Sequence, residues 1–309
     1  KTVYAPSLDL KRELLSPRRA VYQIKQHLAQ AYDKVIRLTP EPGQQLLLSL
    51  WRIYEVDDLK ATLRGVETGT PWNKILFLLY PQSKYATLTT ETMQRMAQSQ
   101  SVTRAVELAR STPYYDTLSH ALQRYREEQS LFPLEVALDL EHNRQIWQII
   151  DRFSGKDREQ ALRIVGSMLD ADNLLWAMRY RVYHNLSAEE IINYTLPLGY
   201  QVRDEDIRAI AAGEDIAQVV ERIYPDLTGF RAYGENGARL EMLEQALKRR
   251  IVKKCRDGLS GDPFHVGVPV AYLVLNEHEI QDLTVILEAK ASQMSIDTFA
   301  PLLTIQPPN

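Results

Sequence analysis

Apolar side chains recur along this chain at alternating steps of three and four residues, which is the spacing of one face of an α-helix. The longest stripe consists of Val21, Ile24, Leu28, Ala31, Val35 and Leu38. Similar stripes lie within residues 216–223 and 240–251. No Asn-Gly or Asp-Gly turn separates two runs of alternating apolar and polar residues, as a β-hairpin would require. The sequence therefore predicts an all-α fold.

Capping signals place the ends of several helices. Ser16 followed by Pro17 predicts a helix that begins at Pro17, because proline fits the first helical position. Ser187 with Glu190 three residues later has the spacing of a capping box, in which each side chain bonds the other residue's backbone N–H. We expect that helix to end before Gly199.

The composition is that of an ordinary globular protein, with 45% hydrophobic and 25% charged residues among 309. A net charge of −3 supplies no general attraction to nucleic acid. The single cysteine, Cys255, can form no intramolecular disulfide, which fits a reducing compartment. No apolar run is long enough for a transmembrane helix, and residues 1–10 do not resemble a signal peptide. We expect a soluble protein that reaches a membrane only through partners.

An internal repeat is the second constraint on the fold. Residues 54–64, 169–179 and 278–288 align with one another at a period of about 110 residues. In this register three acids coincide, and three positions later two acids coincide with an amide. The aligned residues are Glu55, Asp170 and Glu279, followed by Asp58, Asn173 and Asp282. We therefore predict three helical repeats, at residues 1–95, 96–205 and 206–309.

Each of the first two repeats also carries an arginine nine residues after its acid, at Arg64 and Arg179. We expect these arginines to answer the acids across a helical hairpin. One interpretation makes all of these polar residues caps and solvated faces. The other places them on a surface around a pseudo-threefold axis. Under the second interpretation the candidate partner contacts are Glu55, Arg64, Asp170, Arg179 and Glu279.

Motifs of catalysis, cofactor binding and metal binding are absent. Ser154, Gly155 and Lys156 resemble the end of a phosphate-binding loop, but Ile150 stands where that loop needs its first glycine. Two acidic pairs could suggest a metal-binding site, Asp170 with Asp172 and Asp204 with Asp206. Both pairs fall at expected helix starts, where acids complement the helix dipole. We expect no catalytic residue, no cofactor and no metal.

A basic cluster lies at the end of one expected helix, formed by Lys248, Arg249, Arg250, Lys253, Lys254 and Arg256. Cations at this end complement the helix dipole, so a solvated face explains the cluster. A contact for an acidic partner or for lipid headgroups is the alternative.

Several segments together resemble the C subunits of the V/A-type (vacuolar/archaeal-type) rotary ATPases, which correspond to the d subunit of the eukaryotic vacuolar ATPase. Residues 169–181 are similar to the middle-repeat signature of that family. Residues 263–273 with 276–283 are similar to its C-terminal signature, and residues 51–65 to its first-repeat pattern. These segments occur in the family's order, and the resemblance covers nearly the whole chain.

The resemblance implies three similar helical domains around a pseudo-threefold axis, which form a funnel-shaped body. It implies a non-catalytic central-stalk protein at the cytoplasmic face of the membrane, near the membrane stator subunit. The hollow of the funnel would receive the shaft of the D and F subunits, and its closed side would rest on the proteolipid rotor ring. Rotation would thus couple ATP hydrolysis or synthesis to ion transport. A generic helical-repeat adaptor or scaffold, and a helical enzyme with an unrecognised acid pair, are the alternatives.

Overall fold

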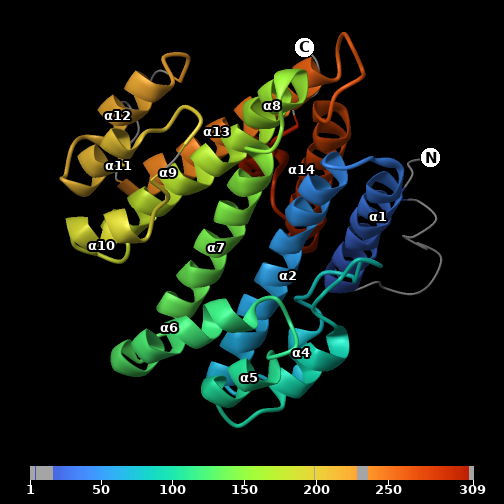
Figure 1. Ribbon diagram of the computed structural model, residues 1–309, viewed down its shortest axis with the longest axis vertical. Helices are drawn as coiled ribbons and strands as arrows, with labels where there is room; N and C mark the ends of the chain where they lie inside the picture. The colour runs from blue at the N-terminus through green and yellow to red at the C-terminus, as the bar shows by residue number, and fades with distance from the viewer. Residues whose placement is uncertain (1–3, 5–16, 198, 228–235, 306–309) are drawn as a thin grey trace. The chain divides into compact units, whose positions relative to one another are not determined.

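A computed structural model describes residue 4 and residues 17–197, 199–227 and 236–305 (Figure 1). In these residues all regular secondary structure is helical, which confirms the predicted all-α class. The first half contains α1 (Pro17–Leu38), α2 (Gly43–Glu67), α3 (Trp72–Ile75), α4 (Thr90–Ala97), α5 (Val102–Leu108), α6 (Tyr115–Glu128) and α7 (Phe132–Ile150).

The second half begins with α8 (Gly155–Ala161), which continues through a π-helical turn (Leu162–Gly166) into α9 (Ser167–Val182). The remaining helices are α10 (Ala188–Asn193), α11 (Asp204–Ala211), α12 (Ile216–Ile223), α13 (Asn236–Gly258), α14 (Gly267–Ala291), α15 (Ile296–Phe299) and a 3₁₀ turn (Ala300–Leu302). α1 begins at Pro17 as predicted, whereas Ser16 lies outside the described residues.

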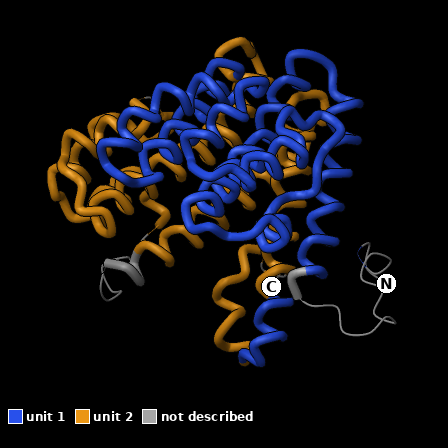
Figure 2. The backbone as a smooth tube through the Cα atoms, turned by 90° about the horizontal axis from the view of Figure 1, so that it is seen from below, with its two compact units in different colours: residues 1–149, 286–294 blue, residues 150–285, 295–309 orange. Residues whose placement is uncertain are grey.

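The chain forms two compact units, shown in different colours in Figure 2. Unit 1 consists of residues 1–149 and 286–294, and unit 2 consists of residues 150–285 and 295–309. The division into three repeats at 1–95, 96–205 and 206–309 stays a prediction.

Unit 1 is built around α2, which packs against α1, α4 and α5. Its core collects buried apolar side chains from α2 to α7, including Leu59, Leu63, Met96 and Leu118. Tyr32 of α1 joins this unit through aromatic contacts, with ring centroids 5.2 Å from Trp51 and 6.0 Å from Tyr54.

The buried face of α1 differs from the predicted stripe. Ile24 and Leu28 are buried as expected, but Leu38 is 68% exposed. Tyr32 and Ile36 complete the buried face instead, at steps of four residues. The prediction was wrong at Leu38, and it left out Tyr32, whose large apolar ring packs against Trp51 and Tyr54.

Unit 2 is built around α9, which packs against α11 and α13. The predicted stripe on α13 is confirmed, because Leu240, Leu243, Leu247 and Ile251 are all buried. The predicted capping box is also confirmed. Ser187 Oγ accepts the backbone N–H of Glu190, and the Glu190 carboxylate accepts the N–H of Ser187 at 2.9 Å.

Candidate functional site

The aligned positions of the repeat hold the same kind of contact in the structure. Asp58 lies on α2, and its Oδ1 accepts the backbone N–H of Tyr80 at 2.8 Å. Asn173 lies on α9 and makes two bonds to Leu196. Its Oδ1 accepts the Leu196 N–H at 2.7 Å, and its Nδ2 donates to the Leu196 carbonyl at 2.9 Å. Both polar side chains are buried.

Asp282 of α14 repeats this contact. Its two carboxylate oxygens accept the backbone N–H groups of Thr304 at 2.8 Å and Ile305 at 2.7 Å. In all three cases the bonded backbone lies 22 or 23 residues further along the chain. A short helix, α3, α10 or α15, lies between the long helix and the bonded backbone each time. We call these three contacts the loop clamps.

The acid three residues earlier holds a second loop segment in two of the repeats. The Glu55 carboxylate accepts the Thr87 N–H at 2.9 Å, the Thr87 hydroxyl at 2.5 Å and the Tyr114 hydroxyl at 2.7 Å. Asp170 accepts the backbone N–H groups of Tyr200 at 2.8 Å and Gln201 at 2.6 Å. Several hydrogen-bond donors, which replace the lost water, make a buried carboxylate charge tolerable inside a protein.

Gly199 permits the close approach of the loop to Asp170. A Cβ at this position would lie 1.9 Å from the carbonyl oxygen of Val202 and 2.7 Å from Oδ1 of Asp170. Both distances are shorter than any van der Waals contact. The helix before it, α10, already ends at Asn193, so Gly199 does not end that helix. Its role in the structure is to make room for the carboxylate.

Burial sets the charge state of these acids. It raises the pKa of Asp58 to about 8, against the opposing effect of the Tyr80 N–H. It raises the pKa of Asp170 to about 6, against three backbone N–H groups and the nearby Lys254 ammonium. Lys254 itself is partly buried, and desolvation lowers its pKa to about 8. These carboxylates therefore titrate far closer to neutral pH than surface acids do.

The five candidate partner contacts fall into two groups. Glu55 and Asp170 are 5% and 1% exposed, and their oxygens bind backbone and hydroxyl groups of the same unit. Glu279 is exposed on α14. The Arg64 and Arg179 side chains are 59% and 41% exposed. The structure thus gives Glu55 and Asp170 a role in holding loops, which neither interpretation of the sequence foresaw.

The expectation that the two arginines answer the repeat acids was wrong. Arg64 forms a two-pronged ion pair with Glu135 of α7, with Nε–Oε1 at 2.5 Å and Nη2–Oε2 at 2.8 Å. Arg179 pairs with Glu244 of α13 at 2.5 Å. The repeat acids already accept bonds from loop backbone, so the arginines bind acids on neighbouring helices.

Four members of the basic cluster have partners inside unit 2. Lys248 pairs with Glu244 at 2.8 Å, and Arg250 pairs with Asp226. Arg249 donates to two backbone carbonyls, at Pro301 and Leu303. Lys254 donates to Ser167 at 2.5 Å and to Gln201 at 3.1 Å. The exposed members are Lys253 and Arg256. Intramolecular pairing therefore explains most of the cluster, and a lipid or acidic-partner contact would rest on these two side chains.

The chemistry of the described residues offers few reactive groups. Burial raises the pKa of the Cys255 thiol to about 12, which keeps it protonated at neutral pH. No group of three or more His, Cys, Asp or Glu in residues 17–197, 199–227 and 236–305 could hold a metal ion. Within the same residues no helix is long and apolar enough to span a bilayer.

Comparisons with known proteins agree on one family. A family model described as "ATP synthase (C/AC39) subunit" matches residues 1–300. The C subunit of the A-type ATP synthase from Methanocaldococcus jannaschii is 22% identical over 302 residues, which cover 96% of this chain and 74% of that protein. The protein of the same name from Methanothermobacter thermautotrophicus is 25% identical over 277 residues, covering 86% and 69%. Because the family model matches nearly its whole length, the chain belongs to the ATP synthase (C/AC39) subunit family.

Proposed function

We propose that this chain is the non-catalytic central-stalk subunit of a rotary A/V-type ATPase. It links the rotating shaft of the D and F subunits to the membrane proteolipid ring, and so couples ATP hydrolysis or synthesis to ion transport. The observation that carries the proposal is the family match over residues 1–300, together with relatives named as the C subunit of A-type ATP synthase. The chain would lie at the cytoplasmic face of the membrane, near the stator subunit, and partners would hold it there.

The loop clamps support a mechanical role. A subunit that transmits torque needs connecting segments that do not yield when one partner turns against another. Asp58, Asn173 and Asp282 each tie the segment after a short helix to the long helix before it. Three repeats around a pseudo-threefold axis would be expected to share such a contact, and the loop clamp occurs in all three aligned segments. We therefore keep the three-domain funnel as part of the proposal.

Among the five candidates, the three with exposed side chains are the proposed contacts with the shaft or the ring. They are Arg64, Arg179 and Glu279. Glu55 and Asp170 would act indirectly, by holding the loop at Thr87 and the loop at 199–202 in place. Contacts made by exposed charged side chains give an association that weakens with salt, because exposed ion pairs are screened.

Co-purification with the D–F shaft tests the proposal. The tagged full chain is mixed with the shaft, and with detergent-solubilised ring, in about 0.05 M and about 0.5 M NaCl. Retention at low salt is expected. Failure to bind either partner at both salts would overturn the proposal and leave a generic helical-repeat adaptor.

A variant pair then tests the contacts. The double variant Arg64→Gln/Arg179→Gln should bind the shaft or ring more weakly than wild type. Arg95→Gln serves as the matched control, since Arg95 is also exposed and no ion pair joins it to another described residue. Equal binding of all three proteins would remove the two arginines from the interface while leaving the stalk role intact.

A further inference from the structure

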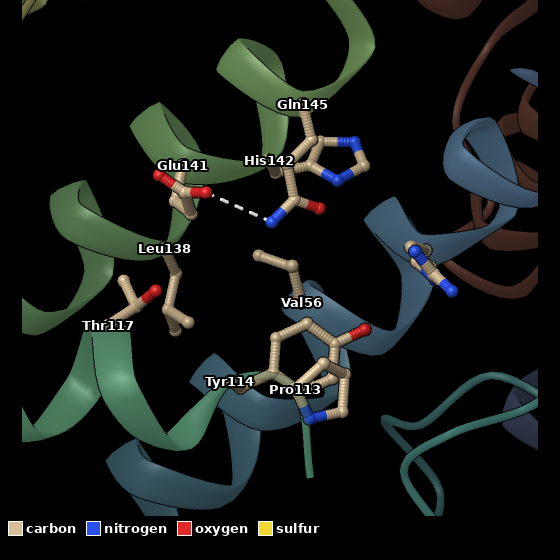
Figure 3. A pocket seen from close by; sticks show the side chains of 9 residues that line it. Val56, Pro113, Tyr114, Thr117, Leu138, Glu141, His142 and Gln145 are labelled. Atoms are coloured by element: carbon tan, nitrogen blue, oxygen red, sulfur yellow. Dashed lines mark hydrogen bonds between the residues drawn. The ribbon is translucent and has the colours of Figure 1, made fainter. Parts of the chain in front are cut away.

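A small hollow in unit 1 is lined by residues of three separate segments (Figure 3). α2 contributes Arg52 and Val56, and α7 contributes Leu138, Glu141, His142 and Gln145. The third segment, at the start of α6, contributes Pro113, Tyr114 and Thr117. The enclosed part has room for about one or two water-sized groups. This size excludes a nucleotide or a phosphate ester and admits a group of about three heavy atoms.

Arg52 supplies a positive charge that forms no ion pair with the described residues. Its side chain is partly buried, and no hydrogen bond or ion pair joins its guanidinium to another described residue. The cation lies close enough to act on two neighbours. It adds to the burial and the Lys60 cation that lower the pKa of His142, and it opposes the burial that raises the pKa of Tyr114. A partly desolvated guanidinium without a partner is costly, and it favours an anion beside it.

His142 supplies an unused polar group. It is only 6% exposed, yet neither ring nitrogen forms a hydrogen bond with the described residues. Burial, with the cations of Lys60 and Arg52, lowers its pKa to about 4, so the imidazole is neutral and offers one N–H donor at neutral pH. A buried side chain of this kind normally has a partner, which a group bound in the hollow would supply.

The charged and phenolic neighbours of these two groups are already committed. Glu141 accepts bonds from Arg144 at 2.8 Å and from Gln145 at 3.0 Å, the latter drawn as a dashed line in Figure 3. The Tyr114 hydroxyl donates a hydrogen bond to the Glu55 carboxylate. Val56 and Leu138 form an apolar wall. Among the described lining residues, the charge that lacks a partner is therefore positive, and it lies beside an unused N–H donor.

We propose that this hollow binds a carboxylate group, held by the Arg52 guanidinium and the His142 N–H. A carboxylate matches the size of the enclosed space, and its two oxygens match the fork of an arginine. The bound carboxylate group belongs either to a small free ion such as formate or acetate, or to an acidic side chain of another subunit. This proposal does not depend on the stalk function proposed above, because every residue that lines the hollow belongs to this chain.

Titration of the isolated full chain with sodium formate tests the proposal. Histidine labelled with ¹³C at Cε1 reports on each of the six imidazoles, and His142→Gln assigns the signal of His142. A saturable shift of that signal is expected, with half-saturation at about 1 mM formate or above, the range open to a three-atom ligand. Arg52→Gln should weaken binding at least about tenfold, as loss of a charge-assisted bond does, whereas Arg95→Gln should leave it unchanged.

Three results would overturn the proposal. A linear response to formate without saturation would mean that the hollow holds only water. An unchanged affinity in Arg52→Gln would remove the proposed anchor. Chloride that gives the same saturable shift would make the site a general anion site instead of a carboxylate site. Because the wild-type titration needs no variant, a folding defect in Arg52→Gln leaves the test decisive.

A second arm identifies the source of the carboxylate. The same titration is repeated on the chain bound to the D–F shaft. Loss of formate binding at least about tenfold would assign the site to an acidic side chain of the partner, which competes for Arg52. Retained binding would assign it to a free carboxylate. A chain that fails to bind the shaft would contradict the stalk function but would leave the carboxylate site supported by the first arm.

Discussion

The Asp58 carboxylate of α2 accepts the backbone N–H of Tyr80 at 2.8 Å, across 22 residues of chain. The aligned residue of α9 is Asn173, which accepts an equivalent backbone N–H with its amide oxygen. The two contacts show that this loop clamp needs an acceptor oxygen and does not need a charge. We therefore expect an amide in place of Asp58 to keep the hydrogen bond to the loop backbone.

Asp58→Asn should stabilise the protein at alkaline pH. Burial raises the folded-state pKa of Asp58 to about 8, so the native state holds the proton more tightly than the unfolded chain. The free energy of unfolding of wild type must then fall as pH rises from about 4 to about 8. Asparagine keeps the acceptor and removes this dependence. We expect the variant to exceed wild type by about 1–3 kcal/mol at pH 8 and to match it near pH 4.

Urea unfolding at pH 4.5, 6.5 and 8 measures this difference. Asp116→Asn is the control, because it makes the same acid-to-amide change at an exposed position on α6. A variant that becomes less stable than wild type as the pH rises would show that the ionised carboxylate is the favoured form.

Gly199→Ala should destabilise the protein strongly. The added Cβ would overlap the Val202 carbonyl at 1.9 Å and approach the Asp170 carboxylate at 2.7 Å, so the loop must move away from its anchor. We expect a loss of about 2–3 kcal/mol in the free energy of unfolding. Gly258→Ala is the matched control, since its Cβ would meet Ile164 at an ordinary 3.4 Å. Equal melting temperatures for the two variants would contradict the proposed crowding.

Arg52→Gln should raise the pKa of His142. The imidazolium is disfavoured first by burial and then by the cations of Lys60 and Arg52, which together lower the pKa to about 4. Removing one cation relieves one of these effects, so the titration midpoint should move up by about half a unit to one unit. A ¹³C titration of the His142 Cε1 signal measures it. An unchanged or lower midpoint would mean that Arg52 does not act on the ring.

The ion pair of Arg64 with Glu135 should contribute little to folding. Its geometry is two-pronged, but 59% of the Arg64 side chain is exposed to solvent. A double-mutant cycle with Arg64→Gln and Glu135→Gln should give a coupling free energy of about 0.5–1 kcal/mol, which declines in about 0.5 M NaCl. A coupling above about 2 kcal/mol would indicate a buried pair and would make Arg64 a poor probe of partner binding.

Local rules determined which parts of the fold the sequence could predict. The helical class, the start of α1 at Pro17 and the capping box at Ser187 depend on residues within one or two turns of each other. The alignment of the repeated segments was also visible, because Asp58, Asn173 and Asp282 recur at a period of about 110 residues. Family membership followed from the order of such segments along nearly the whole chain.

Only the tertiary structure decided what the polar residues contact. Arg64 finds Glu135 on another helix, and the carboxylates of Asp58 and Asp170 find backbone N–H groups more than 20 residues away. Long flexible side chains can reach several partners, and the sequence carries no signal of which one comes within hydrogen-bonding distance. The hollow around His142 is the extreme case. It needs three segments packed together, and its free donors become apparent only after the polar groups around it have found their partners.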